Sequence, residues 1–241
     1  MSGLPQSVSL SLLDIIALVS EKSMRVLLLS SFMAVYLTPV YAQRPVPSEK
    51  AEKTITLFDG KTLDGWKPID PDDAKYWQAK DSLIVGGDGV NPVPKNTYLR
   101  TVDEYGDFEL SCLFRLSGDP GTGFINSGIQ YRSKVVDKDI IGYQADIGDG
   151  HWGDIYDEHR RGLLVQGNLR TVWHLLKRDG WNSYTVRVRG NRHELYINGV
   201  KTCDYTEKDP TIPLSGVIAF QLHSGGTAKI EIRDVTLTPL N

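Results

Sequence analysis

The sequence DFELSCLFRL, residues 107–116, alternates apolar and polar side chains over its whole length. Phe108, Leu110, Cys112 and Phe114 recur at every second position, and successive side chains of a β-strand point to opposite faces of a sheet. The stretch therefore predicts a strand with one face in a hydrophobic core. Because Cys112 lies in phase with this apolar face, we expect a buried free thiol rather than a disulfide with Cys203.

Runs of the same alternating kind continue on both sides, separated by clusters of Gly, Pro, Asn and Asp. Asn198-Gly199 is the strongest short hairpin signal among these breaks. So many short antiparallel strands predict an all-β protein, a two-sheet antiparallel jelly-roll β-sandwich of concanavalin-like form. The expected strands are 54–58, 77–79, 82–85, 97–100, 127–133, 143–147, 163–165, 171–173, 181–189, 194–197, 216–223 and 228–237, of which 163–165 and 171–173 have the weakest pattern.

The first part of the chain has a different pattern. Residues 26–38, VLLLSSFMAVYLT, follow Lys22 and Arg25 and precede a small-x-small site at Val40-Tyr41-Ala42. This is the layout of a secretory signal peptide, whereas a membrane anchor would need a longer apolar run. We expect residues 1–42 to be an over-extended start plus signal peptide, 43–53 a Pro-rich linker and 54–241 the sandwich domain. The predicted location is secreted or periplasmic.

The charge pattern narrows the choice of partners. The net charge is −3 and charges of both signs are interspersed, without the basic stripe that nucleic-acid binding requires. We therefore expect neither a nucleic-acid partner nor a membrane span in the mature protein.

A second stretch, YQADIGDGHWGDIYDEHRR at residues 143–161, is polar and aromatic. It begins as a strand, and Gly148-Asp149-Gly150 then breaks the pattern. We expect a long loop to follow, carrying His151, Trp152 and residues 156–158. Long loops on a rigid sheet commonly carry function, although a solvated charged loop is the alternative.

Polar residues occur in pairs two positions apart in several strands: Gln130 and Arg132, Gln144 and Asp146, Gln221 and His223, and Glu109 and Ser111. Their neighbours are apolar, so each polar pair should point away from the core. If these strands are adjacent, they form one sheet face lined with hydrogen-bonding groups for a polyhydroxylated ligand such as a carbohydrate. The alternative is the ordinary wet face of a sandwich.

Standard catalytic signatures such as G-x-S-x-G, H-E-x-x-H and C-x-x-C do not occur in the sequence. The sequence assigns no cofactor and no metal ligands. A divalent metal held by His151, His159 and acidic side chains of the same loop is the alternative, although positions on a loop set no ligand geometry.

Several motifs together resemble the 3-keto-disaccharide hydrolase family of exported bacterial proteins. They occur in family order between Thr54 and Leu237 and are LFDGKTLDGW, YGDFELSCLFRL, NSGIQYR, YQADI, WNSY leading to RGNRHELYINGV, and GVIAFQLH before IEIRDVTL. The chain departs from the family pattern in its extended GDGHWGDIYDEHRR segment. The resemblance implies a concanavalin-like, laminarinase-like β-sandwich.

The resemblance also implies an enzyme, a glycoside-type hydrolase or lyase acting on sugars oxidised to a ketone at carbon 3. A 3-keto group acidifies the proton on carbon 2. A base can then remove this proton, the glycosidic oxygen on carbon 1 leaves, and addition of water completes a net hydrolysis. Such a reaction needs a general base, an acid and a group that stabilises the enolate.

We predict that a set of polar residues carries out this chemistry. The catalytic candidates are His223, Asp146, Glu158 and Arg132, with Arg132 polarising the substrate; the substrate-binding candidates are Gln130, Gln144, Gln221, Trp152, Tyr156 and Asn126. For Asp146, a plain ion pair with Arg132 is the alternative. For the whole domain, the alternatives are a non-catalytic, lectin-like carbohydrate-binding module and a structural export domain.

Overall fold

The structure, a computed structural model, describes residues 53–178 and 180–240. The predicted start segment and signal peptide, residues 1–42, and all but the last residue of the predicted linker 43–53 lie outside the described residues. Within the part that the structure describes, no helix is long and apolar enough to cross a membrane.

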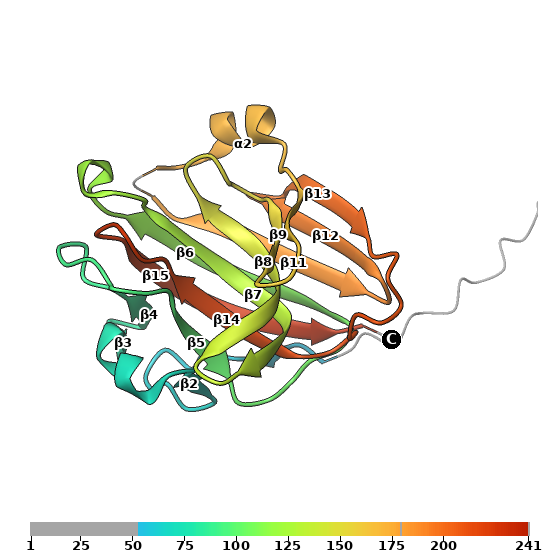
Figure 1. The fold of residues 1–241 in the computed structure, drawn as a ribbon, viewed down its shortest axis with the longest axis horizontal. Coiled ribbons are helices and arrows are strands. Elements are labelled where there is room, and N and C mark those ends of the chain that lie inside the picture. Colours follow the sequence, from blue (N-terminus) through green and yellow to red (C-terminus); the bar gives the residue numbers. More distant parts are fainter. Residues whose placement is uncertain (1–52, 179, 241) are drawn as a thin grey trace, which may run out of the picture. The chain divides into compact units, whose positions relative to one another are not determined.

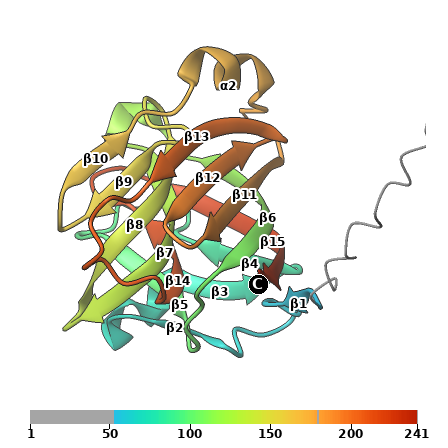
Figure 2. The same cartoon turned by 90° about the vertical axis from the view of Figure 1, so that its right-hand side faces the viewer.

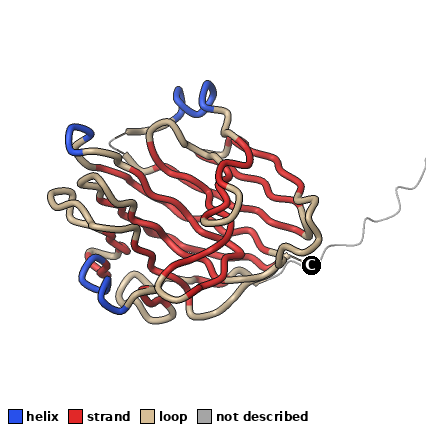
Figure 3. The backbone as a smooth tube through the Cα atoms, in the orientation of Figure 1, coloured by secondary structure: helices blue, strands red, loops and turns tan. Residues whose placement is uncertain are grey.

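Two antiparallel sheets make up the fold, which confirms the predicted β-sandwich (Figures 1 and 3). The eight-stranded sheet runs in the order β13-β12-β11-β6-β15-β4-β3, with β1 beside β15, and the seven-stranded sheet in the order β10-β9-β8-β7-β14-β5-β2. The strands of the first are β1 (Ile55–Thr56), β3 (Trp77–Lys80), β4 (Leu83–Gly86), β6 (Phe108–Ser117), β11 (Asn182–Arg189), β12 (Arg192–Ile197), β13 (Val200–Thr206) and β15 (Lys229–Pro239). The strands of the second are β2 (Trp66–Pro68), β5 (Thr97–Thr101), β7 (Asn126–Val136), β8 (Asp139–Gly148), β9 (Ile155–Glu158), β10 (Gly162–Val165) and β14 (Val217–Leu222).

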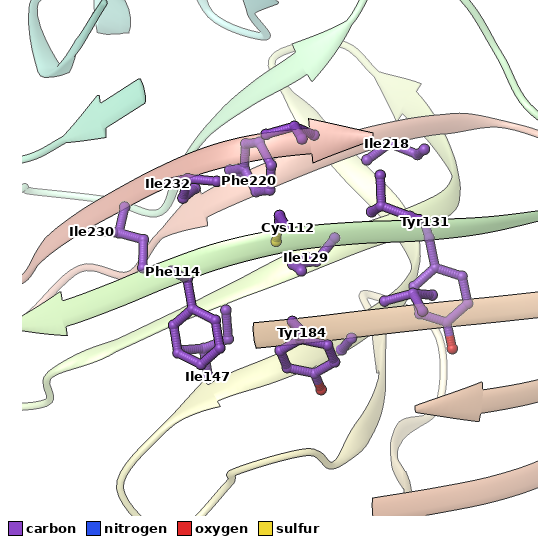
Figure 4. Close-up of a cluster of buried hydrophobic side chains, with 14 of the residues drawn as sticks. Cys112, Phe114, Ile129, Tyr131, Ile147, Tyr184, Ile218, Phe220, Ile230 and Ile232 are labelled. Atoms are coloured by element: carbon purple, nitrogen blue, oxygen red, sulfur yellow. The ribbon is translucent and has the colours of Figure 1, made fainter. Parts of the chain in front are cut away.

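Strand β6 lies between β11 and β15 and supplies the middle of the core, as its alternation predicts. Its residues Phe108, Leu110, Cys112 and Phe114 are buried, and the thiol of Cys112 is free. Figure 4 shows Cys112 and Phe114 among labelled side chains of β7, β14 and β15 between the sheets. Burial of this apolar surface is the main stabilisation of the sandwich.

Tight turns connect the strands with residues that accept a positive φ angle. Asn198 and Gly199, with φ of 50° and 77°, join β12 to β13 as the hairpin signal predicts. Asp81 and Ser82, with φ of 53° and 62°, do the same between β3 and β4. Two consecutive positive φ angles give a turn whose twist matches the right-handed twist of the flanking strands.

A β-bulge interrupts the pairing of β7 with β8. Tyr131 pairs with Tyr143, but the next pair is Lys134 with Ile141, so two residues on β7 face one on β8. Beyond the bulge, the hairpin formed by residues 134–141 bends over the outer face of its own sheet (Figure 1). Its side chains there join an apolar cluster of Tyr98, Ile140, Val217 and Ala219, packed against Ile69 and Val135.

Several segments differ from the sequence prediction, among them β2 and β13, which were not expected as strands. Residues 171–173, expected as a weak strand, belong to the helix α2 (Leu169–Leu175), which is capped by the side chain of Asn168 accepting from the Thr171 N–H at 3.3 Å. The expected loop after Gly150 is short, because residues 155–158 form β9 and pair with β8 (Figure 2). Strand β9 contains Asp157 and Glu158, so its sequence lacks the apolar–polar alternation that predicts a strand.

The core position of Phe114 leads to a stability prediction. Its ring is fully buried and lies 6.2 Å from that of Trp152 and 5.9 Å from that of Tyr184. Phe114→Ala should lower the free energy of unfolding by roughly 3–5 kcal/mol, because it leaves a cavity between rings. Urea denaturation followed by tryptophan fluorescence measures this change.

Val90→Ala is the matched control, because Val90 is 72% exposed. Its free energy of unfolding should stay within about 0.5 kcal/mol of the parent. A Phe114→Ala protein as stable as the Val90→Ala protein would contradict the placement of β6 at the centre of the core.

Candidate functional site

The outer face of the seven-stranded sheet carries a pocket of about 260 Å³. It lies where β8 ends and beside the bent hairpin, across strands β5, β14, β7, β8 and β9. Polar and aromatic side chains line it: Asn96, Phe124, Asn126, Gln144, Asp146, His151, Tyr156, Glu158, Gln221 and His223. The volume approaches the lower end of the range for small-molecule sites.

A chain of hydrogen bonds runs under the pocket floor. The Ser133 hydroxyl lies 3.1 Å from Gln130 Oε1, Gln130 Nε2 donates to Gln144 Oε1 at 2.7 Å, and Gln144 Nε2 donates to Asp146 Oδ1 at 2.8 Å. The side chains of these four residues come from β7 and β8 and are nearly or fully buried. The chain holds the Asp146 carboxyl in one orientation, and each bond polarises the next.

Gly128 makes the space for this arrangement. It pairs with Asp146 across β7 and β8, and a β-carbon built on it would lie 2.5 Å from Gln144 Cδ. The Gln144 side chain therefore crosses Gly128 at a distance that no other residue would allow. The absence of a side chain at position 128 is what brings Gln144 to Asp146.

Burial raises the pKa of Asp146 to about 8, since the carboxyl is only 5% exposed. The nearby carboxylates of Asp154 and Glu158 act in the same direction, while hydrogen bonds from Gln144 and Asn126 oppose the shift. At pH 7 most of this side chain therefore holds its proton. A carboxyl group that is neutral at pH 7 can donate a proton to a bound ligand.

Glu158 is a second carboxyl of the pocket, on β9 opposite Gly142. Burial raises its pKa, and the neighbouring His159 imidazole opposes the shift. His159 Nε2 lies 3.5 Å from Glu158 Oε1 and 3.2 Å from Asp139 Oδ2. His159 thereby connects the pocket carboxyl to the tip of the bent hairpin.

His223 follows β14 and lines the opposite side of the pocket. Its Nδ1 lies 2.7 Å from the carbonyl oxygen of Ser224. A carbonyl only accepts hydrogen bonds, so Nδ1 carries the hydrogen and Nε2 of the neutral ring is an acceptor. The ring is held edge-to-face by Phe124, at 4.9 Å between centroids. The result is an oriented imidazole with a basic nitrogen.

His151 is oriented by a buried carboxylate. Its Nδ1 lies 3.1 Å from Oδ2 of Asp154, which is fully buried and accepts a further hydrogen bond from the Gly167 N–H at 2.7 Å. A carboxylate only accepts hydrogen bonds, so Nδ1 of His151 carries a hydrogen in this pair. His151 also contacts Phe124 edge-to-face at 5.8 Å, so Phe124 lies against both histidines.

Gln221 has an unusual acceptor in the pocket. Its Nε2 donates to the Tyr98 hydroxyl at 3.3 Å, but its buried Oε1 has no hydrogen-bond partner within the described residues. An unmatched buried carbonyl is costly, and a ligand hydroxyl would satisfy it. This atom is therefore a specific place for a donor group of a bound molecule.

The structure brings most of the predicted site residues together. Asp146, Glu158, His223, Gln144, Gln221, Tyr156 and Asn126 all line the pocket. Gln130 does not line it but lies in the layer beneath, where it supports Gln144.

Arg132 was wrongly placed on this face. It sits in the β-bulge with a φ of +47°, which takes it out of phase with Gln130. Its guanidinium donates to Gly106 O, Gly190 O and Asp107 Oδ1 at 3.0, 2.6 and 2.5 Å, groups that belong to the other sheet. Arg132 therefore joins the two sheets, and the alternative of an Arg132–Asp146 ion pair also fails.

Trp152 was wrongly predicted to contact a sugar. It is only 8% exposed and packs against Phe114 in the core. Sequence reasoning also missed Asn96 and Phe124, and it considered His151 only as a metal ligand. Phe124, in a Gly-rich turn, gave a signal that could have been read, because an aromatic residue is costly on a solvated turn.

The predicted metal alternative finds no support in ligand geometry. Within residues 53–178 and 180–240, no group of three or more His, Cys, Asp or Glu side chains is arranged to hold a metal ion. His159 points to Asp139 and Glu158, whereas His151 points to Asp154.

Comparison with known proteins agrees with the fold. A candidate glycosyl hydrolase from Parabacteroides distasonis is 22% identical over 78% of this chain and 94% of its own, with a TM-score of 0.56. A second such structure from that organism is 22% identical over 78% of this chain and 100% of its own, with a TM-score of 0.55. The carbohydrate-binding module CBM66 from Bacillus subtilis is 13% identical over 72% of this chain and 95% of its own, with a TM-score of 0.53. A search of curated protein sequences found no match.

The fold is a two-sheet antiparallel β-sandwich, and the solved structures share it. More specifically, a family model described as a 3-keto-alpha-glucoside-1,2-lyase-like domain matches residues 53–238. The chain belongs to this family, as its motifs predict.

The raised pKa of Asp146 leads to a prediction about stability and pH. The folded protein holds a proton on Asp146 up to about pH 8, because burial raises its pKa, whereas the unfolded chain releases the proton near its ordinary pKa of 3.8. The stabilisation is thus full below pH 4 and is lost as the pH rises to 8, at no more than about 1.4 kcal/mol per pH unit. Asp146→Asn should remove this dependence.

Urea unfolding of both proteins at pH 5 and pH 8 measures the effect. The free energy of unfolding of Asp146→Asn minus that of the parent should be more positive at pH 8 than at pH 5. Asp64→Asn, at an exposed position, is the matched control and should show the same pH trend as the parent. Equal differences at the two pH values would show that Asp146 titrates normally.

Proposed function

We propose that this protein cleaves glycosides whose sugar carries a ketone at carbon 3, by elimination across carbons 1 and 2 followed by addition of water. Membership of the 3-keto-alpha-glucoside-1,2-lyase-like family supports this proposal. The observation that carries it is the pairing, in one pocket, of a carboxyl that is protonated at pH 7 with an imidazole whose Nε2 is free to accept a proton.

His223 is the proposed general base. Its Nδ1–H is occupied by the Ser224 carbonyl, so its basic Nε2 is available for the proton on carbon 2. An imidazole is an effective base near neutral pH because its unperturbed pKa is about 6.5. The edge-to-face contact with Phe124 limits rotation of the ring.

Asp146 is the proposed general acid, since its raised pKa keeps it protonated at pH 7. The hydrogen bond from Gln144 to Oδ1 holds the carboxyl in place where it lines the pocket. Glu158, with its pKa also raised by burial, is the second carboxyl of the pocket and a candidate for activating water in the hydration step.

An enolate also needs a positive or strongly donating group. No Lys or Arg is among the described residues that line the pocket, and Arg132 lies at the other sheet. His151 takes this role in our proposal, because it lines the pocket and the buried Asp154 carboxylate orients its ring. A preorganised group at the developing charge is a large contribution to catalysis.

The bond changes of the proposed reaction balance without a redox partner. The C2–H bond breaks, the proton goes to His223 Nε2, and its electron pair forms the enolate with the C3 oxygen. The enolate re-forms the C3 ketone, a C1–C2 double bond forms, and the C1–O bond breaks. The leaving oxygen takes the proton of Asp146, and water then adds at C1 while a proton returns to C2.

A second candidate function is carbohydrate binding without cleavage. The observation that favours it is the amide lining of the pocket by Asn96, Asn126, Gln144 and Gln221, together with the buried Gln221 Oε1, which has no hydrogen-bond partner within the described residues. Amides and a tyrosine suffice to bind a sugar. Binding of glycosides with no turnover of 3-keto-glycosides would favour this function.

The site residues lead to an activity prediction. His223→Ala and Asp146→Asn should each lower the kcat of the protein for a 3-keto-glucoside by about 10²–10⁴-fold, because each removes a proton-transfer group. Release of the free sugar and the aglycone measures turnover, and the parent glucoside without the ketone should not react. His174→Ala is the matched control, since His174 lies exposed on α2.

The pH profile provides an independent check. The kcat of the parent should fall as the pH rises past about 8, where Asp146 loses its proton. Parallel assays with EDTA address the metal alternative. If both variants remain folded and turn over substrate at the parental rate, neither residue is the acid or the base.

Export is also part of the proposal. Lys22, Arg25, the apolar run 26–38 and the small-x-small site at 40–42 support a cleaved secretory signal. N-terminal sequencing of the periplasmic protein should begin near Gln43. Recovery there of a chain that begins at Met1 would contradict the prediction.

A further inference from the structure

The bent hairpin of residues 134–141 lies on the same sheet face as the pocket and covers the part of it next to β8 residue Ile140. Ile140 and Val135 of the hairpin pack with Val217 and Ala219 on the outer face of the sheet. Two ion pairs attach the hairpin tip: Lys138 Nζ to Asp70 Oδ1 at 2.9 Å, and Asp139 Oδ2 to His159 Nε2 at 3.2 Å. A ligand in the pocket therefore cannot extend along the strands in this direction.

Across the strands, the same face is open beyond Tyr156. Strand β10 is the edge of the sheet, and its Leu163 pairs with Tyr156 of β9. Residues paired across an antiparallel ladder point to the same face, so Leu163 continues the face that carries the pocket. Its side chain is 48% exposed, although it is a large apolar residue.

Tyr156 and Leu163 make a flat surface at this rim. A β-carbon built on Gly162 would lie 3.8 Å from Tyr156 Oη and 4.0 Å from Cζ. The ring of Tyr156 therefore lies over the bare backbone of Gly162 instead of projecting from the sheet. Gly162 has a φ of +74°, so the position both requires glycine and leaves the space under the ring open.

We infer that Tyr156 and Leu163 form a subsite for the leaving group of the substrate, one with a flat apolar face such as an aryl group or the less polar face of a second sugar ring. This inference rests on the proposed function. The pocket takes the terminal oxidised sugar, because the hairpin blocks one direction, and the leaving group lies across β9 and β10. Aromatic and aliphatic side chains bind such faces by excluding water from both.

Matched substrates and variants test the subsite. The substrates are the methyl, 4-nitrophenyl and glucosyl 3-keto-glucosides, and the variants are Leu163→Ala and Leu214→Ala in the full chain. Leu214 is 50% exposed, like Leu163, but does not line the pocket, so it controls for the loss of an exposed leucine. Each variant is compared with the parent on the same substrate, which cancels differences in leaving-group reactivity.

For Leu163→Ala, kcat/KM should fall about fivefold with the 4-nitrophenyl or the glucosyl substrate, mainly through KM, because only uniform binding is lost. It should change by less than about twofold with the methyl substrate. A loss with the aryl compound alone identifies an aryl leaving group, and a loss with the glucosyl compound alone identifies a sugar. Parental values for Leu163→Ala with all three substrates would overturn the subsite.

Failure of the proposed function would look different. The parent would then turn over none of the three substrates, and the subsite would be tested by calorimetric binding of methyl and 4-nitrophenyl glucosides. Weaker binding of the 4-nitrophenyl compound to Leu163→Ala than to Leu214→Ala would support the subsite on a binding protein. Equal affinities for the two variants would overturn it.

Discussion

The hydrogen bond from Gln144 to Asp146 connects the architecture of the sandwich to its pocket. Gln144 reaches Asp146 only because Gly128 leaves the space above β7 empty and because Gln130 holds the other end of its amide. Both glutamines lie on the outer face of β7 and β8, whose inner face is apolar core. The sheet is therefore buried on both faces at this point, which is unusual for an antiparallel sheet.

The bent hairpin covers part of this outer face. The bulge between β7 and β8 turns residues 134–141 over the sheet, where Val135 and Ile140 pack with Val217 and Ala219. The same bulge points Arg132 to Asp107 and Gly190, next to β6 and β11 of the opposite sheet. One local irregularity thus shapes the outer face beside the pocket and connects the two sheets.

The two sides of the pocket carry different chemical groups. The β7–β8 side supplies buried amides and a neutral carboxyl, whereas the other side supplies histidines, each oriented by a separate acceptor. Phe124 lies edge-to-face against both imidazoles. Such a set of oriented carboxyl and imidazole groups is suited to proton transfer, and the amides are equally suited to bind sugar hydroxyls.

Much of the candidate site could be read from strand periodicity. Gln144, Asp146 and Gln221 alternate with apolar residues, and this phase is enough to place them on one face of a sheet. Tyr156 and Glu158 reached the same face for a reason that the pattern did not show, since they belong to β9 and not to a loop. Asn96 and Phe124 were not predicted, because they lie outside the strands and strand periodicity therefore says nothing about where they point.

The amino-acid sequence by itself determined the all-β class, the core face of β6 and the Asn-Gly hairpin, because these depend on local periodicity and on turn conformations of single residues. Only the tertiary structure decided which polar residues share the pocket. A bulge reverses the phase of every residue after it, so Arg132 left the face that its spacing predicted. Likewise, Trp152 packs in the core against Phe114, a residue from the other sheet. Contacts between residues far apart in the sequence produce no periodic pattern, so the sequence alone does not predict them.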